Sequence, residues 1–196
     1  MSTSSVDAGA CALFLMATFV LAGCAQVVWL ASSWSRRFSL PLDGGHAFRG
    51  RRIFGENKTV RGFMVMVPAT ALAFVVVAQV SGHGNPQAIG LWPLSPAGYA
   101  WLGAWTGLGF MLGELPNSFV KRQLDIAPGA ISPHGAAAPW QFVADRLDSG
   151  LGMLTALSLA VPVPWRTWAL VLFLGWALHW SFSVVLFRLG VKPRPA

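Results

Sequence analysis

Residues 140–152 read WQFVADRLDSGLG, and residues 153–163 continue as MLTALSLAVPV. The second part is almost wholly apolar, and a helix needs about 20 mostly apolar residues to cross a bilayer. The pattern therefore predicts a membrane helix that begins within the first part. Asp145, Arg146 and Asp148 lie at the mouth of this helix, although the whole chain has only seven acidic residues. Their position makes them candidates for function.

Apolar residues dominate the whole chain, which has 196 residues, 55% of them hydrophobic and 11% charged. A soluble domain carries about 25% charged residues. We therefore predict an all-α integral membrane protein with a single domain, residues 1–196, built as a bundle of five transmembrane helices. The expected spans are residues 8–31, 63–80, 97–115, 142–161 and 167–187, and the expected polar loops are residues 32–62 and 116–141.

The first apolar run has a second interpretation, because Leu21–Cys24 (LAGC) matches a bacterial lipoprotein cleavage box. A secretory signal normally has basic residues before its apolar region. No Lys or Arg precedes this run, and the run continues beyond the box through VVWLAS. We therefore expect an uncleaved span.

The distribution of positive charge predicts the orientation. Loops 32–62 and 116–141 and the C-terminal tail hold twelve of the fourteen Lys and Arg residues, whereas Arg166 lies on the opposite side. Basic loops stay in the cytoplasm. The N-terminus is therefore expected outside and the C-terminus in the cytoplasm, a split that an odd number of spans requires. We expect a multi-pass protein of the cell membrane.

The net charge of +7 raises the question of a nucleic-acid partner. The basic residues lie in loops between apolar segments, with no basic helix face or stacking surface apparent, so we expect no such partner. Membrane lipids are the expected surroundings, and a homodimer is compatible with a bundle of this size.

The first cytoplasmic stretch, residues 41–63, reads PLDGGHAFRGRRIFGENKTVRGF. It contains two glycine-rich turns and five cations, and backbone N–H groups in such turns bind phosphate together with Lys and Arg side chains. The alternative is a basic loop that only orients the protein. We favour binding for Lys58, Thr59 and Arg61, which lie directly before a span. Asp43, in the first turn, is a further candidate substrate-binding residue.

The second stretch, residues 113–129, reads GELPNSFVKRQLDIAPG. On a helix, Ser118, Lys121 and Arg122 share one face, since they are spaced i, i+3 and i+4. A hydroxyl group beside two cations suits a phosphate ligand. Glu114 lies near the end of the third expected span, where a carboxylate is costly without a partner. It is a candidate functional residue or, alternatively, an ion-pair partner of Lys121 or Arg122.

The third stretch is the opening one. Asp145 and Asp148 are three residues apart, so a helix directs both side chains to the same side. Two convergent carboxylates are suitable ligands for a hard divalent cation. Beside the basic stretches, they suggest Mg²⁺ that bridges the protein and a polyphosphate. The alternative is an ion-paired cluster with Arg146 or Arg122 that stabilises the helix end.

Together, the segments PLDGG, GRRIFGENKTVRGF, SFVKRQLDIAPG and DRLDSGLG resemble the CDP-archaeol synthase family, in the same order, over residues 40–155. The family consists of integral-membrane, CTP-dependent cytidylyltransferases related to bacterial phosphatidate cytidylyltransferases. The resemblance implies that a lipid phosphate attacks the α-phosphorus of CTP, which gives a CDP-activated lipid and pyrophosphate, with Mg²⁺ as the required ion. The family's lipid is an isoprenoid ether-linked glycerol phosphate, with diacylglycerol phosphate and polyprenyl phosphate as alternatives.

The resemblance also implies residue roles at an active site that faces the cytoplasm. The implied metal ligands are Asp145, Asp148 and Glu114. The implied catalytic residues are Lys121, Arg122, Asp145 and Asp148. The residues implied to hold the phosphates of CTP or the lipid phosphate are Lys121, Arg122 and Ser118. The residues implied to complete the nucleotide pocket are Lys58, Thr59 and Arg61.

Three features depart from the family pattern. The family usually has Gly-Asp where this chain has Gly-Glu, at Glu114 and at Glu56, and it usually has Trp where this chain has Val60. The longer carboxylate at Glu114 changes the expected metal geometry. The stretch GAISPHGAAAPWQ, residues 129–141, is longer and richer in Ala than the family pattern, and we interpret it as a lid or a linker.

Two other functions are compatible with parts of the sequence. Asp43 and Gly44 resemble the start of the CDP-alcohol phosphotransferase motif, but only Glu56 follows as an acidic residue before the next span. A small membrane transporter or scaffold would also contain charges within its spans. Here the charges gather at one face of the membrane, which does not suit a path across it.

Overall fold

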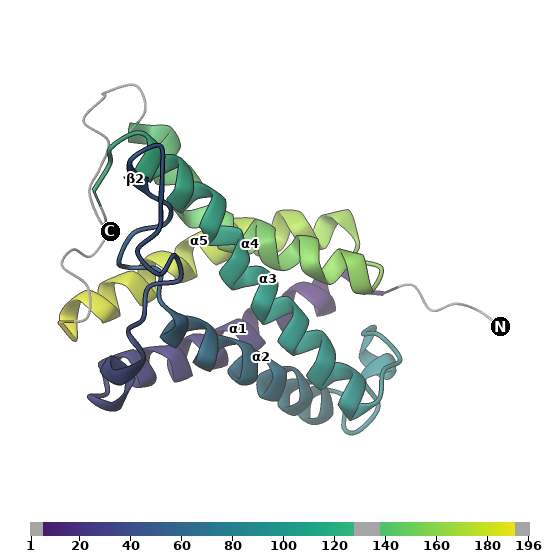
Figure 1. Ribbon diagram of the computed structural model, residues 1–196. Helices are drawn as coiled ribbons and strands as arrows, with labels where there is room; N and C mark the ends of the chain where they lie inside the picture. Colours follow the sequence, from purple (N-terminus) through teal and green to yellow (C-terminus); the bar gives the residue numbers. More distant parts are fainter. Residues whose placement is uncertain (1–5, 128–137, 191–196) are drawn as a thin grey trace.

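The computed structural model of the protein describes residues 6–127 and 138–190. In these residues the chain forms five long α-helices, joined by loops that contain two short 3-10 helices and one small hairpin (Figure 1). The α-helices are α1 (Ala8–Ala31), α2 (Val60–Ser81), α3 (Pro96–Gln123), α4 (Ala138–Ala160) and α5 (Trp165–Arg188). The 3-10 helices are η1 (Trp34–Phe38) and η2 (Pro86–Ile89), and the antiparallel strands are β1 (Ala47–Phe48) and β2 (Arg51–Arg52).

Three of these helices, α1, α2 and α5, are long and apolar enough to cross a membrane, judged by length and composition. The helical membrane architecture predicted from composition is therefore confirmed at this level. The other two long helices carry the charged residues of the second and third polar stretches, which lowers their hydropathy. Their membrane crossing stays a prediction.

The third and fourth helices extend beyond the expected spans. Helix α3 continues to Gln123, and α4 begins at Ala138, so the loop expected at 116–141 is shorter than predicted. Pro116 lies inside α3 without ending it. A proline removes one hydrogen bond of the helix, and neighbouring helices pack along α3 on either side of that position. Most of the expected lid or linker, residues 128–137, lies outside the described residues.

The long helices form one bundle, in which α3 packs against α2 and α4 while α1 packs against α2 and α5 (Figure 1). The C-terminal ends of α1, α3 and α5 lie beside the N-terminal ends of α2 and α4. For example, the indole Nε1 of Trp29 donates a hydrogen bond to the carbonyl oxygen of Arg61, at 3.1 Å, which joins the end of α1 to the start of α2. We call this end of the bundle the polar end, because the three polar stretches meet there.

An aromatic core holds the opposite end together. The ring of Phe14 on α1 packs edge-on against Phe74 on α2, with ring centroids 4.9 Å apart, and against Tyr99 at 5.8 Å. The hydroxyl group of Tyr99 donates to the carbonyl oxygen of Trp92 at 2.7 Å, and the indole of Trp92 donates to that of Pro162 at 2.9 Å. Because these buried polar groups are hydrogen-bonded, burying them costs little free energy. The core therefore holds α1, α2, α3 and the α4–α5 connection together.

Glycines allow α3 and α4 to approach closely near the polar end. A Cβ atom on Gly113 would lie 2.5 Å from the carbonyl oxygen of Asp148, and one on Gly109 or Gly152 would collide with the facing helix. The two backbones therefore touch where no side chain separates them. This contact brings Glu114, the next residue on α3, beside Asp148 and Ser149 on α4.

Candidate active site

The loop before α2 is folded around Asp43, whose side chain is fully buried. Its carboxylate accepts hydrogen bonds from Arg52, with Nη2 at 2.6 Å and Nε at 3.2 Å. It also accepts from the backbone N–H groups of Gly45 at 3.0 Å and of Phe54 and Gly55 at 3.1 Å. The Arg52 guanidinium, and then the three N–H groups against the opposing effect of burial, hold the Asp43 pKa well below its usual range. These contacts give Asp43 a role in folding the loop, and its predicted contact with substrate stays a prediction.

The folded loop is attached to the end of α3. Arg51 forms an ion pair with Asp125 at 2.5 Å and donates to the backbone carbonyl of Gln123. The ring of Phe48 contacts that of Phe119, with centroids 5.8 Å apart. The loop therefore lies against the same segment of α3 that carries the second polar stretch.

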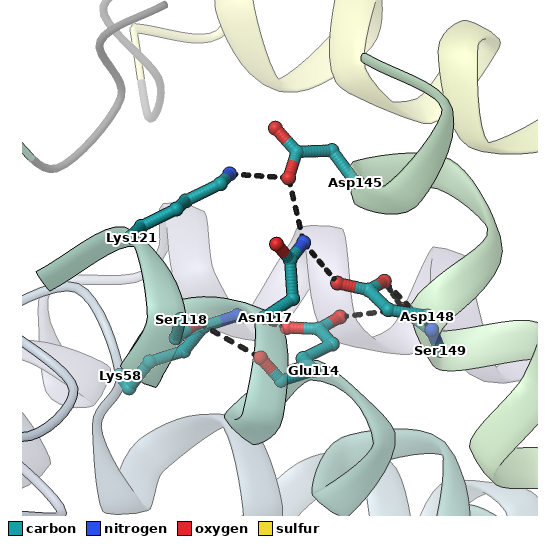
Figure 2. Close-up of polar contacts among 8 residues, drawn as sticks. All are labelled: Lys58, Glu114, Asn117, Ser118, Lys121, Asp145, Asp148 and Ser149. Atoms are coloured by element: carbon teal, nitrogen blue, oxygen red, sulfur yellow. Dashed lines mark hydrogen bonds and ion pairs between the residues drawn. The ribbon is translucent and has the colours of Figure 1, made fainter. Parts of the chain in front are cut away.

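This attachment places Lys58, at the end of the loop, next to Glu114 on α3 (Figure 2). The ammonium group of Lys58 forms a hydrogen-bonded ion pair with Glu114 Oε2, and both side chains are about three-quarters covered, with 25% and 22% exposed. Burial by itself would lower the pKa of Lys58, but the charge and hydrogen bond of Glu114, aided by Asp148 and Asp145, raise it above its ordinary value. Lys58 is therefore charged at neutral pH.

Ser149 links Glu114 to the first turns of α4. Its hydroxyl oxygen lies 2.9 Å from Glu114 Oε1 and 3.2 Å from Asp148 Oδ1, and its backbone N–H donates to Asp148 Oδ1 at 2.7 Å. The hydroxyl group has one proton, so it can donate to only one of the two carboxylates at a time. Because Ser149 is 1% exposed, two carboxylates meet around one buried hydroxyl group.

Asn117 joins the two aspartates by hydrogen bonds. Its amide nitrogen Nδ2 donates to Asp145 Oδ1 at 2.7 Å and to Asp148 Oδ2 at 2.9 Å. Lys121, one turn further along α3, forms an ion pair with the same oxygen of Asp145 (Figure 2). Asp145 and Asp148 therefore face one group, which agrees with their predicted common direction.

We call this set the acidic cluster, and its members are Lys58, Glu114, Asn117, Lys121, Asp145, Asp148 and Ser149. It contains three carboxylates and two ammonium groups, which leaves an excess of negative charge among its members. The sequence analysis did not select Asn117. The signal was available, because Asn117 lies three residues after Glu114 and four before Lys121 on one helix face.

Several ion pairs that the sequence left open are different in the structure. Glu114 pairs with Lys58 of the loop, whereas the sequence suggested Lys121 or Arg122. Asp145 pairs with Lys121, whereas the sequence suggested Arg146 or Arg122. Arg146 instead donates to the backbone carbonyl of its own helix at Phe142, at 2.9 Å, and lies over that ring. The long-range pairs could not be read from spacing, because they join segments far apart in the sequence.

The other predicted phosphate-binding residues lie at the edge of the acidic cluster or outside it. Ser118 is buried and donates to the carbonyl of Glu114 on its own helix, at 2.8 Å. The Nε atom of Arg122 is buried without a hydrogen-bond partner among the described residues, and this burial lowers the pKa of Arg122. Thr59 forms an isolated antiparallel β-bridge with Pro41 at the base of the loop. Arg61 lines a separate cavity.

The acidic cluster has suitable chemistry for a divalent cation. Within residues 6–127 and 138–190, no group of three or more His, Cys, Asp or Glu side chains stands in a metal-binding arrangement. However, carboxylate and amide oxygens are the donors that hard cations prefer. In this structure the Asn117 amide nitrogen lies between Asp145 and Asp148, and the Lys58 ammonium group contacts Glu114. The residues present therefore fit such an ion.

Comparison with known proteins gives the same picture over most of the chain. The family model described as CarS-like, CDP-archaeol synthase, matches residues 13–195. The CDP-archaeol synthase of Halobacterium salinarum is 33% identical over 163 residues, which cover 79% of this chain and 82% of the relative. The enzyme of the same description from Aeropyrum pernix is 31% identical over 191 residues, which cover 94% of this chain and 90% of the relative.

A solved structure supports the relation. It is described as an intramembrane enzyme for archaeal membrane lipids biosynthesis, and it superposes with a TM-score of 0.61 at 26% identity. The match covers 87% of this chain and 90% of that chain. The chain therefore belongs to the CDP-archaeol synthase family and is, as its sequence predicted, an enzyme of the membrane-embedded, CTP-dependent lipid cytidylyltransferase class.

Proposed function

We propose that this protein transfers CMP from CTP to the phosphate of an isoprenoid ether-linked glycerol phosphate, in phospholipid biosynthesis. The products are a CDP-activated lipid and pyrophosphate. The observation that carries this proposal is the acidic cluster, where carboxylates and lysines from three segments converge at the polar end of the bundle (Figure 2). Such a mixture suits a polyphosphate that arrives with a divalent cation.

The two aspartates are the proposed ligands of Mg²⁺. Asp145 and Asp148 would hold the ion, with Glu114 close by through Ser149. When bound, Mg²⁺ would neutralise negative charge on the phosphates of CTP and on the departing pyrophosphate. Asn117 donates to both carboxylates and so holds them close together before an ion binds.

On substrate binding, the two lysines would exchange their carboxylate partners for phosphate groups of CTP. Lys58 and Lys121 each neutralise a carboxylate, and an ammonium group has three donors that can be shared with phosphate oxygens. When the carboxylates turn to a cation, both ammonium groups become free to contact the triphosphate. Arg122, on the turn of α3 beside Lys121, is proposed to add a further cation.

The reaction itself requires no proton transfer from the protein. An oxygen of the lipid phosphate forms a bond to the α-phosphorus of CTP, and the bond between that phosphorus and the bridging oxygen of pyrophosphate breaks. Both the nucleophile and the leaving group are anions. The role of the side chains is therefore to position the reactants and to neutralise charge.

The orientation is part of the proposal. The five long helices would span the cell membrane, with the polar end and its basic loop in the cytoplasm, where CTP is available. The excess of Lys and Arg in the loops at this end supports this direction.

The direct test uses the purified full-length protein with CTP, Mg²⁺ and a panel of lipid phosphates with isoprenoid ether, diacyl and polyprenyl chains. Release of pyrophosphate with formation of a CDP-lipid is the expected result, highest for the isoprenoid ether lipid. Absence of pyrophosphate release with every lipid would overturn the proposal.

Asp148→Asn provides the matched variant for this assay. Loss of an outer partner of a metal ligand costs about 10–100-fold, so loss of a ligand should lower turnover by more than about 100-fold. Glu56→Gln, whose exposed carboxylate lies 3.9 Å from Arg52 and outside the acidic cluster, should keep near-normal turnover. Near-normal turnover of Asp148→Asn, with the protein folded by circular dichroism, would remove the metal role.

A further inference from the structure

A separate, cationic site lies at the polar end, outside the acidic cluster. A cavity of about 300 Å³ opens between the ends of α1 and α5 and the start of α2. Its lining residues are Leu30, Ala31, Arg36, Arg61, Leu189 and Gly190, and none of them belongs to the acidic cluster. Residues 58–62, KTVRG, therefore contribute to two separate sites. Lys58 contacts the acidic cluster, and Arg61 lines this cavity.

Among the residues that the structure describes, two cations, Arg36 and Arg61, line the cavity, and no acidic residue does. In the parts of the chain that the structure describes, neither guanidinium group forms an ion pair. Two unpaired guanidinium groups beside one cavity are a strong arrangement for a phosphate, because each can donate two parallel hydrogen bonds to it.

The surroundings of the cavity belong to the membrane boundary. Its lining residues come from the end of α1, from η1, from the start of α2 and from the two residues after α5. Helices α1, α2 and α5 are the three that are apolar enough to cross a bilayer. Leu30 and Leu189 give it an apolar side. Trp29 and Trp34 flank it in the sequence, and tryptophans gather at the level of lipid headgroups. The lining therefore combines two cations with two leucines.

We propose that this cavity binds the phosphate headgroup of a membrane lipid, with its chains directed along α1 and α5. A lipid with a terminal phosphomonoester fits best, because it has more charge and more free oxygens than a phosphodiester. If the function proposed above holds, this lipid is the acceptor, held at the start of α2 before it reaches CTP. That last identification rests on the proposed function, whereas binding of the headgroup does not.

The test measures lipid binding without turnover. The full-length protein is placed in phosphatidylcholine nanodiscs that contain phosphatidic acid as the phosphomonoester probe, without CTP or Mg²⁺, and native mass spectrometry counts the bound probe. The double variant R36Q/R61Q should bind it about tenfold or more weakly. Arg37→Gln is the matched control, since Arg37 is on the same short helix but lies over Trp34 instead of lining the cavity.

Each outcome decides the question. Equal binding by the double variant and the wild type would overturn the proposal, and so would equal losses in R37Q and in the double variant. A large excess of inorganic phosphate should not displace the probe, and displacement would assign the cavity to a soluble anion. If R36Q/R61Q does not fold, two other variants replace it. Arg36→Gln, at an exposed position, should weaken binding of the probe, and R36K/R61K should largely keep it.

Kinetics separates this proposal from the assignment of Arg61 to the nucleotide pocket. Arg61→Gln should raise the KM for the lipid while the KM for CTP stays unchanged, and a rise only in the KM for CTP would overturn the proposal. The binding assay can also be run on Asp148→Asn, which lacks turnover if the proposed function holds. Binding that depends on the arginines in a wild-type protein without transferase activity would keep the docking site and reject the proposed function.

Discussion

Each carboxylate of the acidic cluster is held by a donor from another segment of the chain. Lys58 reaches Glu114 from the loop, and Asn117 reaches Asp145 and Asp148 across the α3–α4 contact. At this scale the sequence predicted the direction of the two aspartates correctly, because three-residue spacing on a helix is a local property. It could not predict that Lys58 pairs with Glu114, because that pair depends on how a loop of many residues folds back.

Asn117→Ala tests the balance between donor and cation. Without the amide, Asp145 and Asp148 lose a shared donor, and an unpaired buried polar group costs about 1–3 kcal/mol. We expect a lower unfolding temperature without Mg²⁺, and a larger rise on adding Mg²⁺ than in the wild type, since the ion would replace the donor. Asn85→Ala, at an exposed position without a side-chain cap bond, is the control. An equal Mg²⁺ effect in both variants would contradict this role.

At the scale of elements, the glycine contact of α3 with α4 and the folding of the loop around Asp43 determine the site. The sequence identified the glycine-rich turns but assigned them to phosphate binding, because a turn that binds phosphate and one that binds its own aspartate have the same composition. The end of α3 was also placed too early. Charged residues and Pro116 are typical of a loop, but α3 packs against α2 and α4 and stays helical to Gln123.

Gly113→Ala should separate α3 from α4. The added methyl group would lie 2.5 Å from the carbonyl oxygen of Asp148, so the helices must move apart, at a cost of about 1–3 kcal/mol. Turnover should fall by more than stability alone explains, because Glu114 and Asp148 move apart. Gly175→Ala on α5 has no atom within 4 Å of the new methyl group and should be neutral or slightly stabilising. Equal activity of the two variants would show that the contact does not position the site.

Acid should loosen the loop through Asp43. The folded-state pKa of Asp43 lies below its ordinary value of 3.8, so its stabilising effect is complete above pH 3.8 and is lost as the pH falls from there through the folded value. Asp43→Asn should be less stable than the wild type at pH 7 and lose less on acidification, as followed by thermal unfolding. Glu56→Gln should keep the wild-type profile, since Glu56 is exposed and its oxygen is 3.9 Å from Arg52. A wild-type profile in Asp43→Asn would contradict this account.

At the scale of the whole molecule, polar and apolar residues are separated along the bundle axis. The aromatic core around Phe14 and Phe74 lies at one end, and the acidic cluster and the arginine cavity lie at the other. Composition and loop charge were sufficient to predict a helical membrane protein and the end at which its polar stretches meet. Which loop cations meet which carboxylates depends on helix packing, which no local pattern contains.

The orientation gives a prediction for the intact membrane. In a background with both native cysteines replaced by alanine, Glu56→Cys should react with a membrane-impermeant thiol reagent only when the cytoplasmic face is accessible. Asn85→Cys, at the other end of α2, should react only from outside. Both positions are exposed, so access to the reagent depends on the side of the membrane. The reverse pattern of labelling would contradict the orientation.

The close contact between the backbones of α3 and α4 limits the path by which a lipid substrate can reach the acidic cluster. A seam that has no room for a methyl group cannot admit an alkyl tail, so no tail can slip between these two helices beside Asp148. A lipid that brings its head to the acidic cluster must therefore keep its tails outside this seam. Tail length and branching are then sensed by surfaces other than the α3–α4 contact.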